Sequence, residues 1–532
     1  MKGMSTGNSR NLRICLLLTT GIGLSGAMGG SAQARDFSIR QTLFQALEAK
    51  SSQQPDRMVE LLVRVKTPHS DSEPFSEGPL EESLEARRLS VEDSSRDLVS
   101  RLEPIPLAAA SQVSTDLIPG LAKSPIVLDT YWAARCIHLL VPASQVSSLM
   151  NHPHVDGIFE DTQVQAIPED ELTPQTTDAL ITATTDWWGQ HKIRSSEARQ
   201  RFKVDGQGVL VGHIDTGIDP SHPALNGKIH RFMDFVNKRP TAYDDQGHGT
   251  HTAGSIAGGG GMGVAPGVRL VVAKALNSRG DGRLSNLLKA MQWMLDPDGN
   301  PQTADYPAVV NNSWGVKPTA AKRQGFESTL FWESVRAWRS KGIVPVFAAG
   351  NKGPGNLLVP GAYPVNLGVG ATDRNDHVVS FSASGRIDWI GWAFFKPDLC
   401  APGFDIVSAS PGGKVATLSG TSMAAPHVTG LLALSIQLRP RIAVRDREKI
   451  LLDASLDLGA RGRGQRSGEG RIDAVKTLEL TRDYRPHAQT TRYAPVFMQA
   501  RRFRVESNRG VARILETEQP SNQARMSDIV EE

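Results

Sequence analysis

Between about residues 205 and 480, short apolar runs alternate with segments that suit helices. Several runs are apolar on consecutive residues and rich in Val and Ile, which is typical of parallel strands buried on both faces. We therefore predict an α/β fold, a mostly parallel sheet covered by helices on both faces, in a domain spanning 196–480. The predicted strands are 208–214, 270–276, 308–312, 343–348 and 367–371, and the predicted helices are 284–295 and 331–341.

The pattern before residue 165 differs and predicts a small separate α+β domain over 35–165. Residues Met58–Val65 alternate in polarity as a half-buried strand does. Charged residues interleaved with Leu and Val over 81–102 suit an exposed amphipathic helix. Further strands are predicted at 136–141 and 155–159, and a further helix at 143–151.

The first 34 residues have the pattern of a secretory signal peptide. Lys2, Arg10 and Arg13 precede an apolar run over 14–28, and small residues at Ala32–Ala34 suit cleavage. The run is shorter than the roughly 20 residues that a membrane-spanning helix needs. We expect a secreted protein, extracellular or periplasmic, whose mature form has no membrane segment.

Two other segments have the composition of connections rather than of packed domains. Thr, Pro and acidic residues dominate a predicted linker at 166–195, and such a segment suits proteolytic processing. The last segment, 481–532, loses apolar periodicity and is rich in Arg, Gln, Asn and Glu, which predicts a disordered tail.

Composition narrows the classes of partner. The chain has 532 residues, 39% of them apolar, and a net charge of +3 from well-mixed signs, which does not favour nucleic-acid binding. Cys15 lies in the predicted leader, while Cys136 and Cys400 lie in different predicted domains. We therefore expect no disulfide between the last two.

A candidate nucleophile lies in the segment Ser419–Gly430, where a small-residue turn precedes an apolar helix. Ser422 would stand at the head of that helix, where free backbone N–H groups and the helix dipole favour developing negative charge. A serine before a helix is more often a simple N-cap, so Ser422 needs partners elsewhere in the chain.

Three other segments offer such partners. Asp215 ends an apolar strand and could orient a histidine, although a turn aspartate is the commoner explanation. His248 stands between two glycines at a helix start, and Asn351 follows a strand and could donate to an oxyanion. The spacing of His248 and His251 differs from that of zinc-binding HExxH helices, so no metal site is predicted.

The order Asp, His, Asn, Ser is the order found in subtilisin. The chain resembles the subtilases, the subtilisin-like serine peptidases, through four motifs within about 205–474. An insertion at 296–301 resembles the bacillopeptidase F branch of that family. The four motifs are Ile214–Asp219, His248–His251, Ala348–Asn351 and Gly420–Ala424.

The resemblance implies a role for each motif. Ser422 would attack the peptide carbonyl, His248 would carry the proton, and Asp215 would orient His248. Asn351 and the Ser422 backbone N–H would bind the oxyanion. Two segments would bind an extended polypeptide substrate as added strands. They are Gly280, Asp281 and Gly282 on one side and Ser313, Trp314 and Gly315 on the other.

The segment 136–164 is similar to the second half of a subtilase propeptide. That similarity implies a zymogen whose own propeptide assists folding, inhibits the enzyme and is cut off by it. Neither a cofactor for catalysis nor an oligomer is implied, so a monomer is expected. A structural calcium is possible but cannot be assigned, because the glycine loop 258–263 lacks side-chain oxygens and 296–301 has an incomplete loop pattern.

Three other classes of protein fit the sequence less well. A surface-anchored structural protein would show a membrane anchor or internal repeats, and the sequence pattern shows neither. An α/β-hydrolase would need a G-x-S-x-G turn, and Gly420–Ala424 lacks the second glycine. A catalytically inactive subtilisin-like scaffold, binding or inhibitory, would most simply have lost one of the catalytic residues, and all are present. Lys352 follows Asn351 directly, and if its side chain reaches the rim of the primary pocket we expect some tolerance for acidic residues on the acyl side of the cut.

Overall fold

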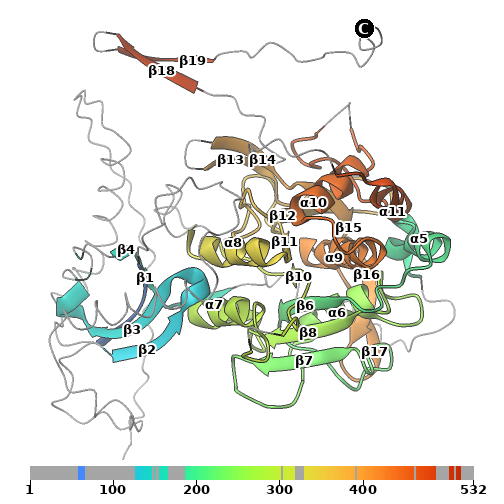
Figure 1. Cartoon of the computed structure of the whole chain (residues 1–532), viewed down its shortest axis with the longest axis horizontal. Helices are drawn as coiled ribbons and strands as arrows, with labels where there is room; N and C mark the ends of the chain where they lie inside the picture. Colours follow the sequence, from blue (N-terminus) through green and yellow to red (C-terminus); the bar gives the residue numbers. More distant parts are fainter. Residues whose placement is uncertain are drawn as a thin grey trace, which may run out of the picture.

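The computed structural model describes residues 58–65, 126–165 and 186–486, and the backbone of 503–508 and 511–516 (Figure 1). Short gaps within these ranges fall at 147–148, 150–151, 153–154, 301–302, 318–328, 390–391 and 460–462. The predicted leader, the helix predicted at 81–102 and the first two thirds of the predicted linker lie outside the described residues. Within the described part of the chain, no helix is long and apolar enough to cross a bilayer.

The central sheet has seven strands in the order β15-β12-β11-β10-β6-β8-β7, and all six neighbouring pairs are parallel. The α/β fold class is therefore confirmed. The chain leaves β6 toward β7 and β8 on one side and returns to β10 on the other. The strands are β6 (Leu210–Asp215), β7 (Ile229–Asp234), β8 (Arg269–Lys274), β10 (Val309–Asn312), β11 (Val344–Ala348), β12 (Leu367–Thr372) and β15 (Leu399–Pro402).

Helices cover both faces, because alternate strand residues are apolar on each side. Val211 and Val272 pack in a core cluster with residues of α6 and α9, whereas Ile214 and Phe347 pack in a second cluster with α7 and α8. The first face also carries α5, α10 and α11. The helices are α5 (Ser195–Phe202), α6 (His248–Ala257), α7 (Leu284–Trp293), α8 (Trp332–Lys341), α9 (Thr421–Leu438), α10 (Val444–Asp453) and α11 (Ala474–Asp483).

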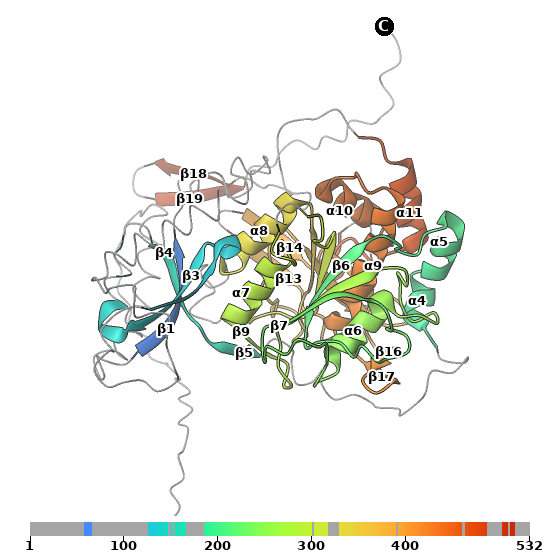
Figure 2. The ribbon, with the colours of Figure 1, turned by 60° about the horizontal axis from the view of Figure 1, so that its bottom comes forward.

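The N-terminal unit is an antiparallel sheet in the order β2-β3-β1-β4. Its strands are β1 (Met58–Val65), β2 (Ile126–Tyr131), β3 (Cys136–Pro142) and β4 (Val155–Glu160). Strand β2 was not predicted, and the helix predicted at 143–151 begins as a 3-10 turn, η3 (Ala143–Gln145). A second 3-10 turn, η2 (Trp132–Ala134), contacts α7 and α8, beside which the whole sheet lies in Figures 1 and 2.

Part of the predicted linker belongs to the packed α/β region. Helix α4 (Trp188–Lys192) lies within 166–195, and its Trp188 and Gln190 are buried. Gln190 Nε2 donates to the Met262 carbonyl at 2.8 Å. The packed region therefore begins before residue 196, because an indole and a paired amide anchor this helix.

Two parts of the segment 481–532 have regular structure among the described residues. Helix α11 continues to Asp483, and β18 (Phe503–Asn508) pairs with β19 (Val511–Glu516) as an antiparallel hairpin. Both strand sequences alternate in polarity for several residues, a short pattern that the charged composition of the segment hides. Two other hairpins join β13 (Gly385–Trp389) to β14 (Trp392–Lys396) and β16 (Ile406–Ser410) to β17 (Lys414–Leu418).

Candidate active site

Asp215 and His248 meet at the carboxyl end of β6, where the chain connections diverge and open α/β sheets bind ligands. His248 is the first residue of α6, and its Nδ1 lies 2.8 Å from Asp215 Oδ1. Asp215 Oδ1 also accepts the Thr216 N–H at 2.7 Å, and Oδ2 accepts the Thr252 hydroxyl at 3.1 Å. Both residues are almost fully buried, so the pair is held in one geometry.

The electrostatics keep Asp215 ionised. Burial alone would raise its pKa, but the adjacent His248, the hydrogen bond from that ring and the Thr216 N–H lower it below the usual range. Burial instead lowers the pKa of His251 to about 3 and that of His427 to about 4, so both stay neutral near pH 7. Of these buried groups, His248 is the one joined to a carboxylate and suited to carry a proton.

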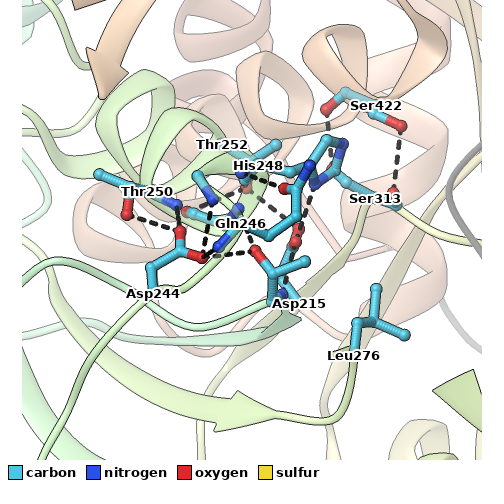
Figure 3. A network of polar contacts seen from close by, with 12 residues as sticks. Asp215, Asp244, Gln246, His248, Thr250, Thr252, Leu276, Ser313 and Ser422 are labelled. Carbon is cyan, nitrogen blue, oxygen red and sulfur yellow. Dashed lines mark hydrogen bonds and ion pairs between the residues drawn. The ribbon is translucent and has the colours of Figure 1, made fainter. Parts of the chain in front are cut away.

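The first turn of α6 is fixed by side chains that satisfy its free N–H groups. Gln246 Oε1 accepts the His248 N–H at 2.7 Å, and Thr216 Oγ1 accepts the Gly249 N–H at 2.8 Å. Asp244 accepts from the Thr250 N–H and hydroxyl at 2.8 and 2.7 Å and from the Thr216 hydroxyl at 3.0 Å. Figure 3 shows this network around the His248 helix start.

Ser422 is the second residue of α9, at the buried head of that helix. Its hydroxyl donates to the Ser313 carbonyl at 3.1 Å, and the Ser313 hydroxyl donates to the Ser422 carbonyl at 2.7 Å. In Figure 3, Ser422 lies on one side of His248 and Asp215 on the other. Residues more than 200 positions apart in the chain are thus gathered at one end of the sheet.

Asn351 leaves β11 through a turn in which Gly350 has φ +119° and in which a Cβ would lie 2.9 Å from Leu358 Cγ. Its Oδ1 accepts from both the backbone N–H and the hydroxyl of Thr421, at 2.8 and 2.9 Å. Because these donors fix the oxygen, the amide nitrogen is directed away from Thr421. The Asn351 side chain is therefore anchored beside the helix head that carries Ser422.

One predicted substrate-binding segment is paired with the N-terminal unit. Strand β9 (Asp281–Arg283) forms an antiparallel ladder with β5 (Gln163–Gln165), in which Val164 lies opposite Gly282 and Gln165 opposite Asp281 (Figure 2). Gly280, with φ +75°, forms the preceding turn. A polypeptide strand of this same chain therefore lies along the edge where a substrate strand was expected.

The other predicted segment contributes mainly its backbone. The Trp314 indole is buried in the core, with its ring centroid 5.7 Å from that of Phe331 and 5.8 Å from that of Phe347. Ser313 presents its carbonyl to Ser422, as described above, and a Cβ on Gly315 would lie 2.6 Å from Leu358 Cβ.

Salt bridges join the N-terminal unit to the helices beside the site. Arg283 Nε donates to Asp161 Oδ2 at 2.6 Å, and Asp161 Oδ1 accepts the Ser285 N–H at 2.9 Å at the start of α7. Arg283 also contacts Glu60. The carboxylate of Asp161 is fully buried by these contacts.

Two clusters within the described residues have side chains of the kinds that ligate metals. Glu60, His138 and Asp161 form one, into which Arg283 inserts, and Asp296, Asp298 and Asp305 form the other. Arg231 pairs with Asp298 and Asp305, so an arginine cation already compensates charge in each cluster. Both clusters lack the full ligand pattern of a calcium loop.

The residues that support the site but were not predicted include His213, Thr216, Asp244, Gln246 and Thr252. The sequence spacing could have identified two of them, Thr252 and His213. Thr252 follows His248 by four residues on a helix, and His213 precedes Asp215 by two on a strand, so each pair shares a face.

Comparison with known proteins gives consistent matches. Residues 206–474 match the sequence model of the Subtilase family. The chain is 36% identical over 295 residues to bacillopeptidase F of Bacillus subtilis (strain 168), covering 50% of this chain but 20% of that relative. It is 35% identical over 292 residues to M-protease of Shouchella clausii (strain KSM-K16), covering 54% of this chain and 67% of the relative. With subtilisin Savinase of Lederbergia lenta it shares 36% identity over 258 residues, 48% of this chain and 85% of the relative.

Proposed function

The chain belongs to the subtilase family, and from that premise we propose that it is a secreted serine endopeptidase made as a self-processed zymogen. The observation that carries the proposal is the 2.8 Å contact between Asp215 Oδ1 and His248 Nδ1, with Ser422 beside the same imidazole. A carboxylate, an imidazole and a serine hydroxyl in this relation are the parts that acyl transfer through a covalent intermediate requires.

In the proposed reaction, Ser422 Oγ attacks the carbonyl carbon of the scissile bond while His248 Nε2 takes the hydroxyl proton. The ionised Asp215 stabilises the imidazolium that forms. The Asn351 amide and the Ser422 backbone N–H donate to the oxyanion of the tetrahedral intermediate. When that intermediate collapses, His248 gives its proton to the leaving amine, and water then releases the acyl group by the same steps.

Extended polypeptides are the proposed substrates, bound through the backbone of β9 and of Ser313–Gly315. Support comes from β5, which already pairs with β9 as an added antiparallel strand. We propose that residues 35–165 are the propeptide, that the chain is cut within 166–187, and that the propeptide inhibits the enzyme until it leaves. Export by a signal peptide, a monomeric state and catalysis without a cofactor complete the proposal.

Active-site labelling tests the catalytic proposal. A fluorophosphonate should label mature wild-type protein at Ser422, and Ser422→Ala should abolish the label. His248→Ala should slow labelling strongly, because the serine then has no base. If the folded wild type is not labelled, the catalytically inactive scaffold would be the better account.

N-terminal sequencing of the secreted protein tests the zymogen proposal separately. Wild type should yield a mature N-terminus within 166–187, whereas Ser422→Ala should keep residues 35–165 attached. Processing of Ser422→Ala at the same bond would show that another peptidase makes the cut.

A further inference from the structure

A second histidine lies beneath the catalytic pair and takes no part in the reaction proposed above. His213 is on β6, two residues before Asp215, so both side chains face α6. The ring is fully buried, and its Nε2 lies 3.0 Å from the carbonyl oxygen of Gly249 in the first turn of that helix. His213 therefore connects the strand that carries Asp215 to the helix that carries His248.

The contact identifies the protonation form of the ring. A backbone carbonyl can only accept, so Nε2 of His213 must carry the proton and donate to Gly249. Burial lowers the pKa of His213, and Nδ1 has no hydrogen-bond partner in the described part of the chain, which both favour the neutral ring. The neutral Nε2–H tautomer satisfies all of these observations.

This tautomer limits where the neighbouring Thr252 hydroxyl can donate its single proton. Four acceptors lie in reach: Asp215 Oδ2 at 3.1 Å, the carbonyls of His248 and Gly249 at 3.2 Å each, and His213 Nε2 at 3.5 Å. With its proton present, Nε2 of His213 is no longer an acceptor, and it occupies a lone pair of the Gly249 carbonyl, so Asp215 Oδ2 and the His248 carbonyl remain as the less encumbered acceptors. The ionised Asp215 Oδ2 is then the nearest and most strongly accepting site.

We propose that His213 is a positioning residue of the catalytic apparatus, whose Nε2–H occupies the Gly249 carbonyl and so directs the Thr252 hydroxyl onto Asp215 Oδ2. The inference rests on the proposed peptidase function. Thr216 N–H and His248 Nδ1 bind Oδ1, and Thr252 binds Oδ2, so each carboxylate oxygen has a donor. The carboxylate then cannot rotate away from His248, and part of its charge is compensated.

Steady-state kinetics across pH separate this role from simple packing. In His213→Leu, the Gly249 carbonyl loses the ring donor and competes with Asp215 Oδ2 for the Thr252 hydroxyl, so the Asp215 charge is on average less compensated and His248 is more easily protonated. The acid limb of kcat/KM should move up by a few tenths of a pH unit, and kcat should fall by about threefold to tenfold at unchanged KM. Thr252→Val should reproduce both effects. His213→Gln, which can still donate an N–H to Gly249, should restore most of the wild-type profile.

The double variant gives the decisive comparison. If His213 acts through Thr252, His213→Leu with Thr252→Val should behave like Thr252→Val alone. Additive losses, or an unmoved acid limb, would overturn the proposal. His222→Leu is the matched control, because His222 is equally buried and its Nε2 donates to the Lys414 carbonyl at 2.8 Å outside the site. His222→Leu should lower the melting temperature without moving the acid limb of the kcat/KM profile.

One measurement needs no activity. In Ser422→Ala protein labelled with ¹⁵N-histidine, NMR should show His213 as the neutral Nε2–H tautomer from pH 5 to 9. An Nδ1–H or doubly protonated ring would refute the inference even if the enzyme is active. Conversely, an inactive wild type with the expected tautomer would contradict the peptidase proposal and leave the His213 contact itself intact.

Discussion

Replacing Asp215 by asparagine should remove a charge but leave His248 in the correct tautomer. The Thr216 N–H can only donate, so the oxygen of the new amide must stay at the position of Oδ1, where it also faces His248 Nδ1 at 2.8 Å. The new NH₂ group then takes the position of Oδ2, and the Thr252 hydroxyl can rotate to accept from it. His248 therefore still donates from Nδ1 and keeps Nε2 unprotonated, so that Nε2 can act as the base.

The magnitude follows from that geometry. A hydrogen bond to a charged partner contributes about 1.5 to 3 kcal/mol, so Asp215→Asn should lower kcat by about 10- to 150-fold. An asparagine that forces the wrong histidine tautomer costs about 10⁴-fold instead. Because the lost carboxylate no longer favours the imidazolium, the acid limb should also move to lower pH, which makes the loss smaller in acid.

The assay is kcat for a chromogenic peptide between pH 5 and 10. Mature Asp215→Asn protein is prepared with resin-bound wild type, and any leached wild type is measured by active-site titration. Adding Thr252→Val removes the acceptor for the new amide and should deepen the loss. A loss near 10⁴-fold at every pH, unchanged by Thr252→Val, would refute the tautomer argument.

Three further predictions concern other parts of the molecule. Asn351→Ala should lower kcat by about 10²- to 10³-fold with little change in KM, which single-turnover acylation kinetics would check. Lys352→Ala should reduce cleavage after Asp and Glu in a peptide library, and an unchanged profile would remove that role. Asp398→Asn should lower the free energy of unfolding by about 3 to 5 kcal/mol, because it removes the carboxylate that pairs with the fully buried Lys396. Thermal denaturation would measure the change in an inactive Ser422→Ala background. Burial already lowers the pKa of Lys396, so the unfolded chain binds the extra proton, and the deficit should shrink as pH rises.

Much of the fold was readable from the sequence because the central strands are buried on both faces. The runs predicted at 308–312 and 343–348 correspond to β10 and β11 within one residue at each end. Strand β2 was missed because Val127 and Leu128 are both exposed, which breaks the alternation that would reveal it. Its partner β3 supplies the pairing that the local pattern does not show.

The candidate site also contains residues that the sequence could predict and residues that it could not. Asp215, His248, Asn351 and Ser422 stand in short motifs at strand ends and helix heads, so local sequence was enough to nominate them. The contact of His213 with Gly249 depends on how α6 lies over β6, which no local pattern specifies. Supporting residues of this kind become visible only when strand and helix are seen together.

If residues 35–165 are an inhibitory propeptide, the pairing of β5 with β9 makes the inhibition after cleavage depend on protein concentration. In the uncut chain the strand and the edge that it covers belong to one molecule, so their pairing does not depend on the protein concentration. After the proposed cut the same pairing becomes an encounter between two molecules, so its occupancy falls with dilution. Cleaved protein at high concentration would stay blocked by its own strand, whereas the same protein diluted into a large volume would be unblocked without any further signal.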